Sequence, residues 1–419
     1  MNGSPAEVPL TGAPGAGRIV PLDALRGLAV MGIVAMNVFA FAMPGAAYYN
    51  PAAYNPGGRA SPVELVLWAA SYLLIEDKFR TLFAMMFGAG VAILLEKPGP
   101  SRLRAHYGRM AVLFAIGFLH ALLLFSGDVL RLYALAGVVL PLCARWRARS
   151  LWIACVALML LYMAAGSWIG GPWMEYWWRV ATVPGTDPSP LAPAEYAFGA
   201  DPAAIERGLA LGRETLKEHL ARRLSAPLSA LYAAALVLPT TLAGMLAGMA
   251  CWRNGLLAGQ WSPGRSFRLA AKLAVVSIPP LGLLITVIFW SGFDGAVVGT
   301  SALVWSAPFD LLLGIGWAAL AMGLFVRAGA AAWVSRLAAV GRMALTNYLL
   351  TSVILSAVFA SWGLGLFGEV SRLATYGIAL IPPVLMLLWS PAWLRHFRQG
   401  PAEWLWRGLA QARFLPFRR

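Results

Sequence analysis

Long apolar windows separated by short polar or basic segments run along the whole chain. Because about 20 apolar residues suffice for a helix to cross the roughly 30 Å hydrocarbon core of a bilayer, these windows predict about ten transmembrane helices. We therefore expect an all-α, polytopic integral membrane protein in which residues 1–419 form a single membrane domain. The windows lie at roughly 26–43, 75–95, 107–126, 129–144, 150–170, 228–250, 270–290, 300–325, 338–362 and 373–393.

Two windows leave the number of spans open by one. The window at 129–144 is short for a span, and the window at 75–95 follows another apolar stretch, 62–74. That stretch is either an interfacial helix or part of one long tilted helix.

Composition agrees with lipid as the main partner. Hydrophobic residues make up 60% of the chain and charged residues 12%, against about one half and one quarter in soluble proteins. The net charge of +15 does not indicate nucleic acid, because Lys and Arg lie between apolar windows instead of on one polar face. Cys143, Cys155 and Cys251 are widely spaced in or beside apolar windows, which predicts neither a disulfide framework nor a metal site.

The basic residues predict the orientation. They concentrate in segments that alternate as the loops of one side would, and the positive-inside rule places that side, with both termini, in the cytoplasm. We expect no cleaved leader, so the first helix stays in the cytoplasmic (inner) membrane. The basic segments are 18–26, 97–109, 145–149, 253–272, 327–342 and a cytoplasmic tail at 394–419.

The segment 171–227 is then an extracytoplasmic loop. Leu209, Leu216 and Leu220 recur at helical spacing opposite a charged face, which predicts an amphipathic surface helix. A passive interfacial helix is favoured over a lid. The charged face comprises Glu206, Arg213, Glu214, Lys217, Glu218 and Arg222.

Polar and ionisable side chains within the apolar windows require a function or a partner, because inserting a charged group into the membrane costs about 2.5–3.5 kcal/mol. The predicted topology places one group of them in the outer half of the membrane, where they suggest a shared polar chamber. Structural roles stay open, since polar residues also join helices and long cations snorkel. The outer group is Asn37, Glu76, Asp77, Lys78, Arg80 and His120, with Asp128 and Arg131 flanking the next turn.

A second group lies near the cytoplasmic face. Asp23 and Arg26 begin the first window, and Arg109 and Arg342 lie beside others. Cations here are suited to hold the phosphates of a soluble donor that enters from within.

His120 is the candidate general base. His106, His219 and His396 fall in charged segments expected to face water, whereas His120 lies inside an apolar window. A neutral imidazole accepts a proton from a hydroxyl or amine near physiological pH. This favours a base over a buried structural histidine.

Five segments in order resemble the YeiB-like family of bacterial membrane proteins, which is labelled as a domain of unknown function. They are Arg18–Gly27 (RIVPLDALRG), Lys78–Gly90, Gly117–Leu130, Gly341–Tyr348 (GRMALTNY, with Asn347) and Gly400–Arg407. That family is similar to a branch of the transmembrane acyltransferase superfamily. The resemblance implies transfer of an acyl group from a cytoplasmic acyl-CoA, usually acetyl-CoA, to a hydroxyl or amine on the far side, with no tightly bound cofactor.

One departure concerns the base. Bacterial O-acetyltransferases of that superfamily carry a catalytic His eleven positions after an Arg in the first helix, whereas here Arg26 is followed at that spacing by Asn37. The lysosomal relative has its His in the next loop, but the loop 44–61 has none. His120 is then the remaining intramembrane candidate.

The leading hypothesis is an acyltransferase with His120 as base. Asp128, Glu76 or Asp77 would orient the imidazole, and a direct bond to Asp128, about 12 Å along an ideal helix, needs the turn at 126–127 to fold back. Glu76 or Asp77 is therefore expected to be the better partner. The substrate-binding set comprises Lys78, Arg80 or Arg131 at the oxyanion, Arg26 and Arg342 at the donor, and Asp23, Asn37 and Asn347.

We also expect a continuous polar cavity from Arg26 and Arg342 to Asn37, Lys78 and His120. The alternative function is a transporter or flippase of a small polar or amphiphilic solute, in which helices rock around the same chamber. A non-catalytic scaffold is a third interpretation. The sequence leaves open whether the protein forms a homo-oligomer.

Overall fold

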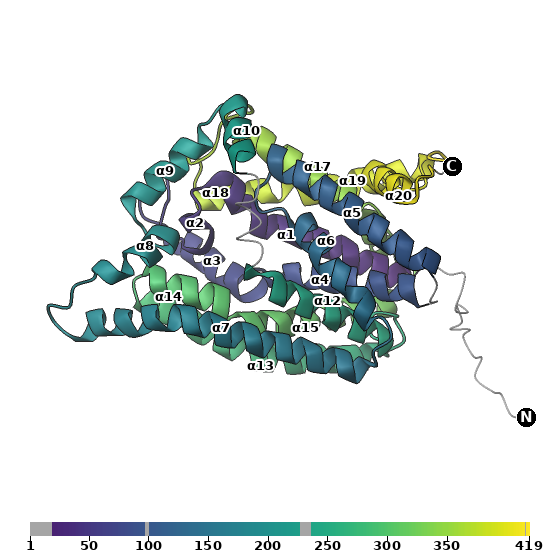
Figure 1. Ribbon diagram of the computed structural model, residues 1–419, viewed down its shortest axis with the longest axis horizontal. Coiled ribbons are helices and arrows are strands. Elements are labelled where there is room, and N and C mark those ends of the chain that lie inside the picture. Colours follow the sequence, from purple (N-terminus) through teal and green to yellow (C-terminus); the bar gives the residue numbers. More distant parts are fainter. Residues whose placement is uncertain (1–18, 97–99, 227–235, 415) are drawn as a thin grey trace, which may run out of the picture.

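The computed structural model describes residues 19–96, 100–226, 236–414 and 416–419. Helices account for the regular elements of these ranges, so the all-α polytopic membrane fold expected from the apolar windows is confirmed (Figure 1). The α-helices are α1 (Val20–Ala42), α2 (Ala46–Tyr49), α3 (Pro62–Leu74), α4 (Lys78–Leu95), α5 (Pro100–Leu123), α6 (Val129–Val139), α7 (Ala148–Thr182), α8 (Ala192–Phe198), α9 (Pro202–Gly212), α10 (Leu216–Ser225), α12 (Leu238–Arg253), α13 (Pro263–Trp290), α14 (Gly295–Thr300), α15 (Ala307–Ala328), α16 (Ala332–Arg342), α17 (Ala344–Phe359), α18 (Arg372–Ala379), α19 (Ile381–His396) and α20 (Pro401–Gln411).

Seven helical stretches in the described part of the chain are long and apolar enough to cross a membrane. The pair α16 and α17, bent by 78°, makes an eighth if it counts as one span. The two remaining windows contain the shorter helices α6 and α12, and residues 228–235 of the second window lie outside the described residues. The bilayer environment follows from this apolar helical content.

The second span is broken in its middle. Residues Pro62–Leu95 form one stretch of 34 residues, in which α3 ends at Leu74 and α4 begins at Lys78. Asp77 at the break has a φ of 57°, in the left-handed region. The stretch 62–74 is thus part of a long span, and the charged run at 76–80 lies within that span instead of at the outer interface.

Close helix crossings position the site. A Cβ placed on Gly88 of α4 would lie 2.0 Å from the carbonyl oxygen of Met245 in α12, and one on Gly248 would lie 2.0 Å from that of Met85. These reciprocal glycines let the two backbones approach, as small residues do between membrane helices. Through this crossing α4 lies between α12 and α1, and α1 contacts α16 and α17 on its other side.

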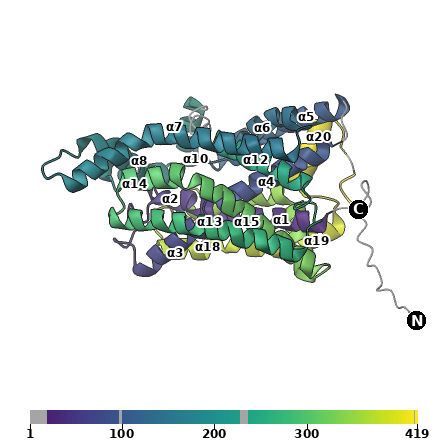
Figure 2. The same ribbon diagram turned by 90° about the horizontal axis from the view of Figure 1, so that it is seen from below.

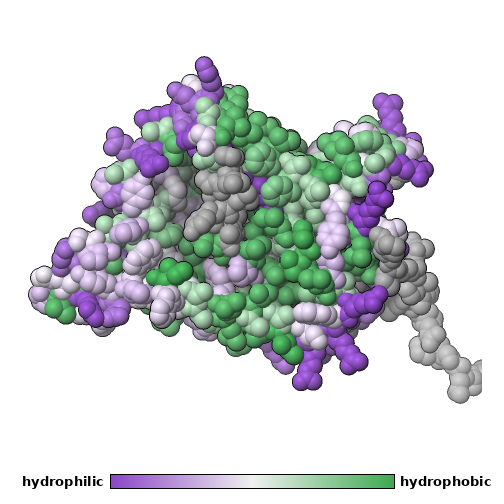
Figure 3. Space-filling view, viewed as in Figure 1, coloured by the Kyte–Doolittle hydropathy of each residue, from purple (hydrophilic) through white to green (hydrophobic). Residues whose placement is uncertain are grey.

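The molecule has two different ends. At the lid end, α8, α9 and α10 gather, and at the basic end α7 and α13 begin and the described C-terminus lies (Figures 1 and 2). Figure 3 shows a hydrophobic band between two hydrophilic ends, the surface expected of a protein that faces lipid around its middle.

Candidate functional site

The larger cavity, about 750 Å³, lies at the lid end, and we name it the lid cavity. Its walls come from the C-terminal part of α1, the break before α4, the first turn of α6, and α9 and α10. Its lining combines aromatic and aliphatic side chains with polar and charged ones. The polar side chains that line it include Asn37, Asp77, Arg80, Asp128, His219, Arg222, Arg223 and Thr240.

A second cavity, about 330 Å³, lies toward the basic end, and we name it the basic-end cavity. Four arginines gather around an apolar interior formed by side chains such as Phe83, Met86 and Leu113. Arg26 is paired with Asp23 at 2.8 Å, whereas the Nε of Arg109 has no hydrogen-bond partner among the described residues. The four arginines are Arg26, Arg109, Arg342 and Arg407.

The beginning of α6 contributes to the walls of both cavities. Asp128 and Leu132 line the lid cavity, whereas Leu130 and Tyr133, on the other face of the same turn of α6, line the basic-end cavity. No described residue lines both. The continuous cavity expected from the sequence is therefore wrong for this conformation, because α6 places a packed wall in its middle.

Aromatic hydroxyls brace this wall. The backbone N–H of Val129 donates to the Tyr348 hydroxyl at 3.3 Å, and the Tyr133 hydroxyl donates to the backbone oxygen of Arg80 at 3.1 Å. Since Tyr348 and Tyr133 both line the basic-end cavity, they connect its floor to the elements that line the lid cavity.

His120 and Asp128 form a buried pair inside the wall. The His120 Nδ1 lies 2.7 Å from the Asp128 Oδ2, and both side chains are almost fully buried. The other carboxylate oxygen accepts from the backbone N–H of Arg131 at 2.9 Å, so Asp128 also caps α6. The partner expected for His120, Glu76 or Asp77, is wrong, because the chain folds back between α5 and α6.

Gly117 makes that fold possible. A Cβ at this position would meet the Asp128 Oδ1 at 2.6 Å and the Arg131 nitrogen at 2.7 Å. The Arg131 guanidinium then donates to the Ser126 carbonyl at 3.1 Å and closes the turn.

His120 itself lines neither cavity. Its ring lies 5.1 Å from that of Tyr348 and 6.3 Å from that of Phe125, measured between centroids. Its Nε2 is buried and has no hydrogen-bond partner among the described residues. With Asp128 on Nδ1, the free Nε2 is the atom available for proton transfer.

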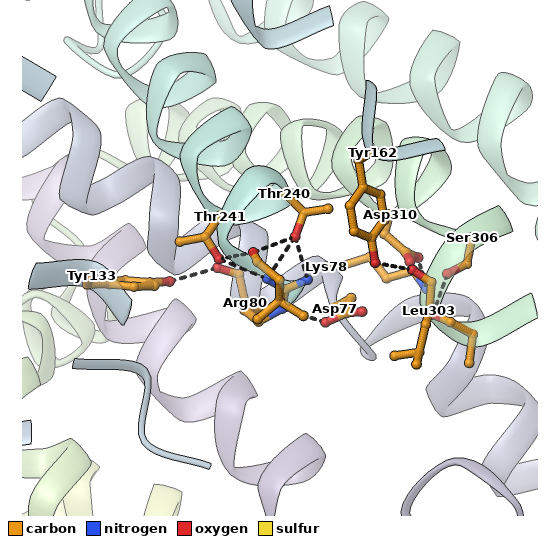
Figure 4. A network of polar contacts seen from close by, with 12 residues as sticks. Asp77, Lys78, Arg80, Tyr133, Tyr162, Thr240, Thr241, Leu303, Ser306 and Asp310 are labelled. Atoms are coloured by element: carbon orange, nitrogen blue, oxygen red, sulfur yellow. Dashed lines mark hydrogen bonds and ion pairs between the residues drawn. The ribbon is translucent and has the colours of Figure 1, made fainter. Parts of the chain in front are cut away.

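Three charged residues at the break, Asp77, Lys78 and Arg80, take part in two separate ion pairs (Figure 4). Arg80 donates to Asp77 at 2.6 Å and to the hydroxyl of Thr241 at 3.2 Å, and this pair lines the lid cavity. Lys78 is sequestered instead, because its Nζ lies 2.6 Å from Asp310 and both side chains are almost fully buried.

Lys78 therefore does not belong to the polar chamber in which the sequence placed it. Sequence reasoning missed Asp310, although it is the one charged residue in the apolar window 300–325 and so required a partner. Glu76 points elsewhere as well. It borders a cavity of about 10 Å³, the size of one water, beside Arg372.

Asn347 also lies outside both cavities. Its amide donates to the Val340 carbonyl at 3.0 Å and its oxygen accepts from the Trp389 indole at 3.0 Å, so it braces the bend between α16 and α17. Of the predicted substrate-binding residues, the lid cavity collects Asn37 and Arg80, and the basic-end cavity collects Arg26 and Arg342. Asp23 pairs with Arg26, which lines the basic-end cavity. Arg131 pairs with Asp128, which lines the lid cavity.

The segment in which the sequence predicts an amphipathic surface helix contains α9 and α10, and both helices line the lid cavity. His219, expected in water, is only 7% exposed and lines this cavity. It belongs to the stripe of α10 that includes Leu216 and Leu220, a periodicity visible in the sequence. Burial, then Arg223 and Arg222, lower the pKa of His219 to about 4, so its imidazole is neutral at physiological pH.

Comparison with known proteins places the chain in a family. It is 34% identical over 416 residues to the Escherichia coli (strain K12) protein named "Uncharacterized protein YeiB", and the alignment covers 94% of this chain and 96% of that protein. The chain belongs to the YeiB-like family. Residues 251–413 match the domain described as "Protein of unknown function (DUF418)".

A more distant YeiB-like relative is the Bacillus subtilis (strain 168) protein named "Uncharacterized protein YxaH", which is 27% identical over 95% of this chain and 96% of its own length. A protein of Bacillus acidopullulyticus, "Uncharacterized 39.9 kDa protein in amylase 3'region", is 24% identical over 95% of each chain. None of these names states an activity.

Proposed function

We propose that this protein is a transmembrane acyltransferase that moves an acyl group from a soluble acyl-CoA in the basic-end cavity to a hydroxyl or amine in the lid cavity. The observation that carries the proposal is that the beginning of α6 contributes to the walls of both cavities and lies beside the buried His120–Asp128 pair. Transfer across a membrane needs a donor pocket and an acceptor pocket near a proton acceptor, and the two cavities with the buried pair beside them support this proposal.

The basic-end cavity suits a CoA-type donor. Arginine guanidinium groups bind phosphate through paired hydrogen bonds, and four arginines line this cavity. The apolar interior next to them suits the uncharged arm and the thioester. Arg109 and Arg407 thus join Arg26 and Arg342 in the proposed donor site.

The proposed reaction is a single displacement. The acceptor hydroxyl loses its proton to the His120 Nε2 as its oxygen bonds to the thioester carbonyl, and Asp128 stabilises the imidazolium through Nδ1. Arg131 or Arg80 is the cation available for the oxyanion. When the carbon–sulfur bond breaks, the imidazolium returns the proton to the thiolate. Since His120 lines neither cavity, the wall of α6 and Tyr348 must shift for the groups to meet.

Binding of CoA tests the proposal. Radiolabelled acetyl-CoA should bind the purified protein in nanodiscs, and Arg109→Ala should weaken this binding by roughly 10- to 100-fold, because a hydrogen bond to a charged group contributes about 1.5–3 kcal/mol. Arg104→Ala, on the same helix but outside the cavity, serves as control and should bind as wild type. Failure of the wild-type protein to bind acetyl-CoA would contradict the donor site.

The proposal requires the basic end to face the cytoplasm, as the positive-inside rule favours. Cys143, Cys155 and Cys251 are all buried and can be replaced to give a cysteine-free background. In intact spheroplasts, an impermeant maleimide should modify a cysteine introduced at Asp187 and spare one at Gln411. The reverse labelling pattern would show the opposite orientation and exclude a cytoplasmic donor in the basic-end cavity.

Transport is the second candidate, favoured by one observation. The breaks between α3 and α4 and between α16 and α17 are discontinuities of the kind that secondary transporters use around their substrates. A deletion strain separates the candidates. A missing acylated lipid, glycan or secreted metabolite supports the enzyme, whereas unchanged chemistry with an altered distribution across the membrane supports transport.

A further inference from the structure

A cluster of guanidinium groups borders the lid cavity beneath α10. Arg222 is paired with Glu214 through contacts of 2.7 and 3.0 Å from its Nε and 2.7 Å from its Nη2. Arg223 forms no comparable ion pair among the described residues. Its guanidinium donates to the backbone oxygen of Ala121, and its buried Nε has no hydrogen-bond partner among the described residues.

The field at this cluster is positive. The pKa of Arg223 is lowered to about 10 by burial, and then by Arg222 and Arg131, against a smaller opposing effect of Glu214. Such mutual repulsion is relieved when an anion binds. The charges at the far side of the cavity are already matched, because Arg80 pairs with Asp77 and Arg131 with Asp128. Residues 227–235, next along the chain, include no Asp or Glu that could neutralise Arg223.

His219 lies in the same wall with one nitrogen free. Its ring packs on Trp362 with centroids 4.8 Å apart, and its Nδ1 lies 4.0 Å from the Glu214 carboxylate. Its buried Nε2 has no hydrogen-bond partner among the described residues. A neutral imidazole held in this way accepts or donates one hydrogen bond to a hydroxyl group.

We infer that the lid cavity binds an acceptor in which an anionic group, a phosphate or a carboxylate, lies next to a free hydroxyl. Arg223 and Arg222 hold the anion, and the His219 Nε2 positions the hydroxyl. The role as acceptor rests on the proposed function, but the binding of the anion does not. Phosphate and carboxylate take the paired hydrogen bonds of a guanidinium, and the aromatic walls of the cavity accommodate the remainder of the ligand.

The ligand can be a lipid headgroup or a free anion, and the probes distinguish these sources. sn-Glycerol 1-phosphate carries the shared chemistry in soluble form, phosphatidylglycerol carries it on a lipid, and glycerol and phosphatidylcholine serve as controls without the net charge. Binding is measured on the full chain with no acyl donor present. Equilibrium dialysis of the protein in phosphatidylcholine nanodiscs reports the soluble probe, and mass spectrometry of lipids retained after exchange from mixed micelles reports the lipid.

Arg223→Gln should weaken binding of the charged probe by at least about ten-fold and reduce its dependence on salt. Glu214→Gln should tighten binding several-fold, because it releases Arg222 from its carboxylate. This gain keeps the inference testable even if Arg223→Gln fails to fold. Arg207→Gln, an exposed arginine of α9 outside the cavity, is the matched control and should bind as wild type.

Preference for either charged probe over its uncharged or zwitterionic control supports the inference and names the source. Binding of both charged probes no tighter than their controls, or no effect of both Arg223→Gln and Glu214→Gln, would overturn it. Anion binding that follows these variants, in a protein that neither binds nor cleaves acetyl-CoA, would contradict the proposed function and leave the anion site intact.

Discussion

Lys78→Ala is expected to eliminate most of the folded protein. The substitution leaves the Asp310 carboxylate buried and unpaired within the membrane, and breaking a buried ion pair in this way costs about 3–5 kcal/mol. That is a large fraction of the stability of a typical folded protein. Fluorescence-detected size exclusion should show a strongly reduced monodisperse peak, and any remaining protein should melt at a clearly lower temperature.

Two further variants distinguish loss of the Lys78–Asp310 ion pair from a general sensitivity of the protein to substitution. Lys78→Met combined with Asp310→Leu removes both charges and should recover much of the folded protein, because well-packed apolar residues replace a buried pair at little cost. Lys272→Ala, at an exposed lysine of α13, should behave as wild type. A melting temperature of Lys78→Ala within a degree or two of wild type would show that the pair contributes little and that Lys78 is available for another role.

His120→Ala should lower acyl transfer by about 10² to 10⁴ while donor binding stays close to wild type, since general base catalysis contributes that much. Asp128→Asn keeps an oxygen to cap α6 but removes the carboxylate from Nδ1, so it should also lower turnover. If the two residues act as one unit, the double variant should be no slower than His120→Ala alone. Turnover is measured from acetyl-CoA with saturating acceptor.

The control for this experiment is His396→Ala, an exposed histidine at the end of α19, which should retain wild-type turnover. Full activity of His120→Gln would remove His120 as the base. The free nitrogen of His219 would then be the next proton acceptor to test, because it borders the cavity in which the acceptor is proposed to bind.

The chain pattern predicted the fold class and the helices, because lipid imposes a simple rule. Backbone groups in hydrocarbon must bond within a helix, so runs of apolar residues mark the spans whatever their neighbours are. The same rule singled out the intramembrane charges and His120, since each costs free energy that demands a reason. The helix breaks were harder to predict from the sequence, because the φ of Asp77 depends on packing as well as on residue type.

Helix packing decides which polar groups meet. Sequence distance suggested that Asp128 lay too far along the helix from His120, yet the turn after α5 brings their side chains to 2.7 Å. Lys78 meets Asp310, more than two hundred residues away, through the contact of α4 with α15. Local periodicity sets the face and the depth of a side chain, but its partner is set by which helices cross and at what height, which depends on the close fit of many side chains at once.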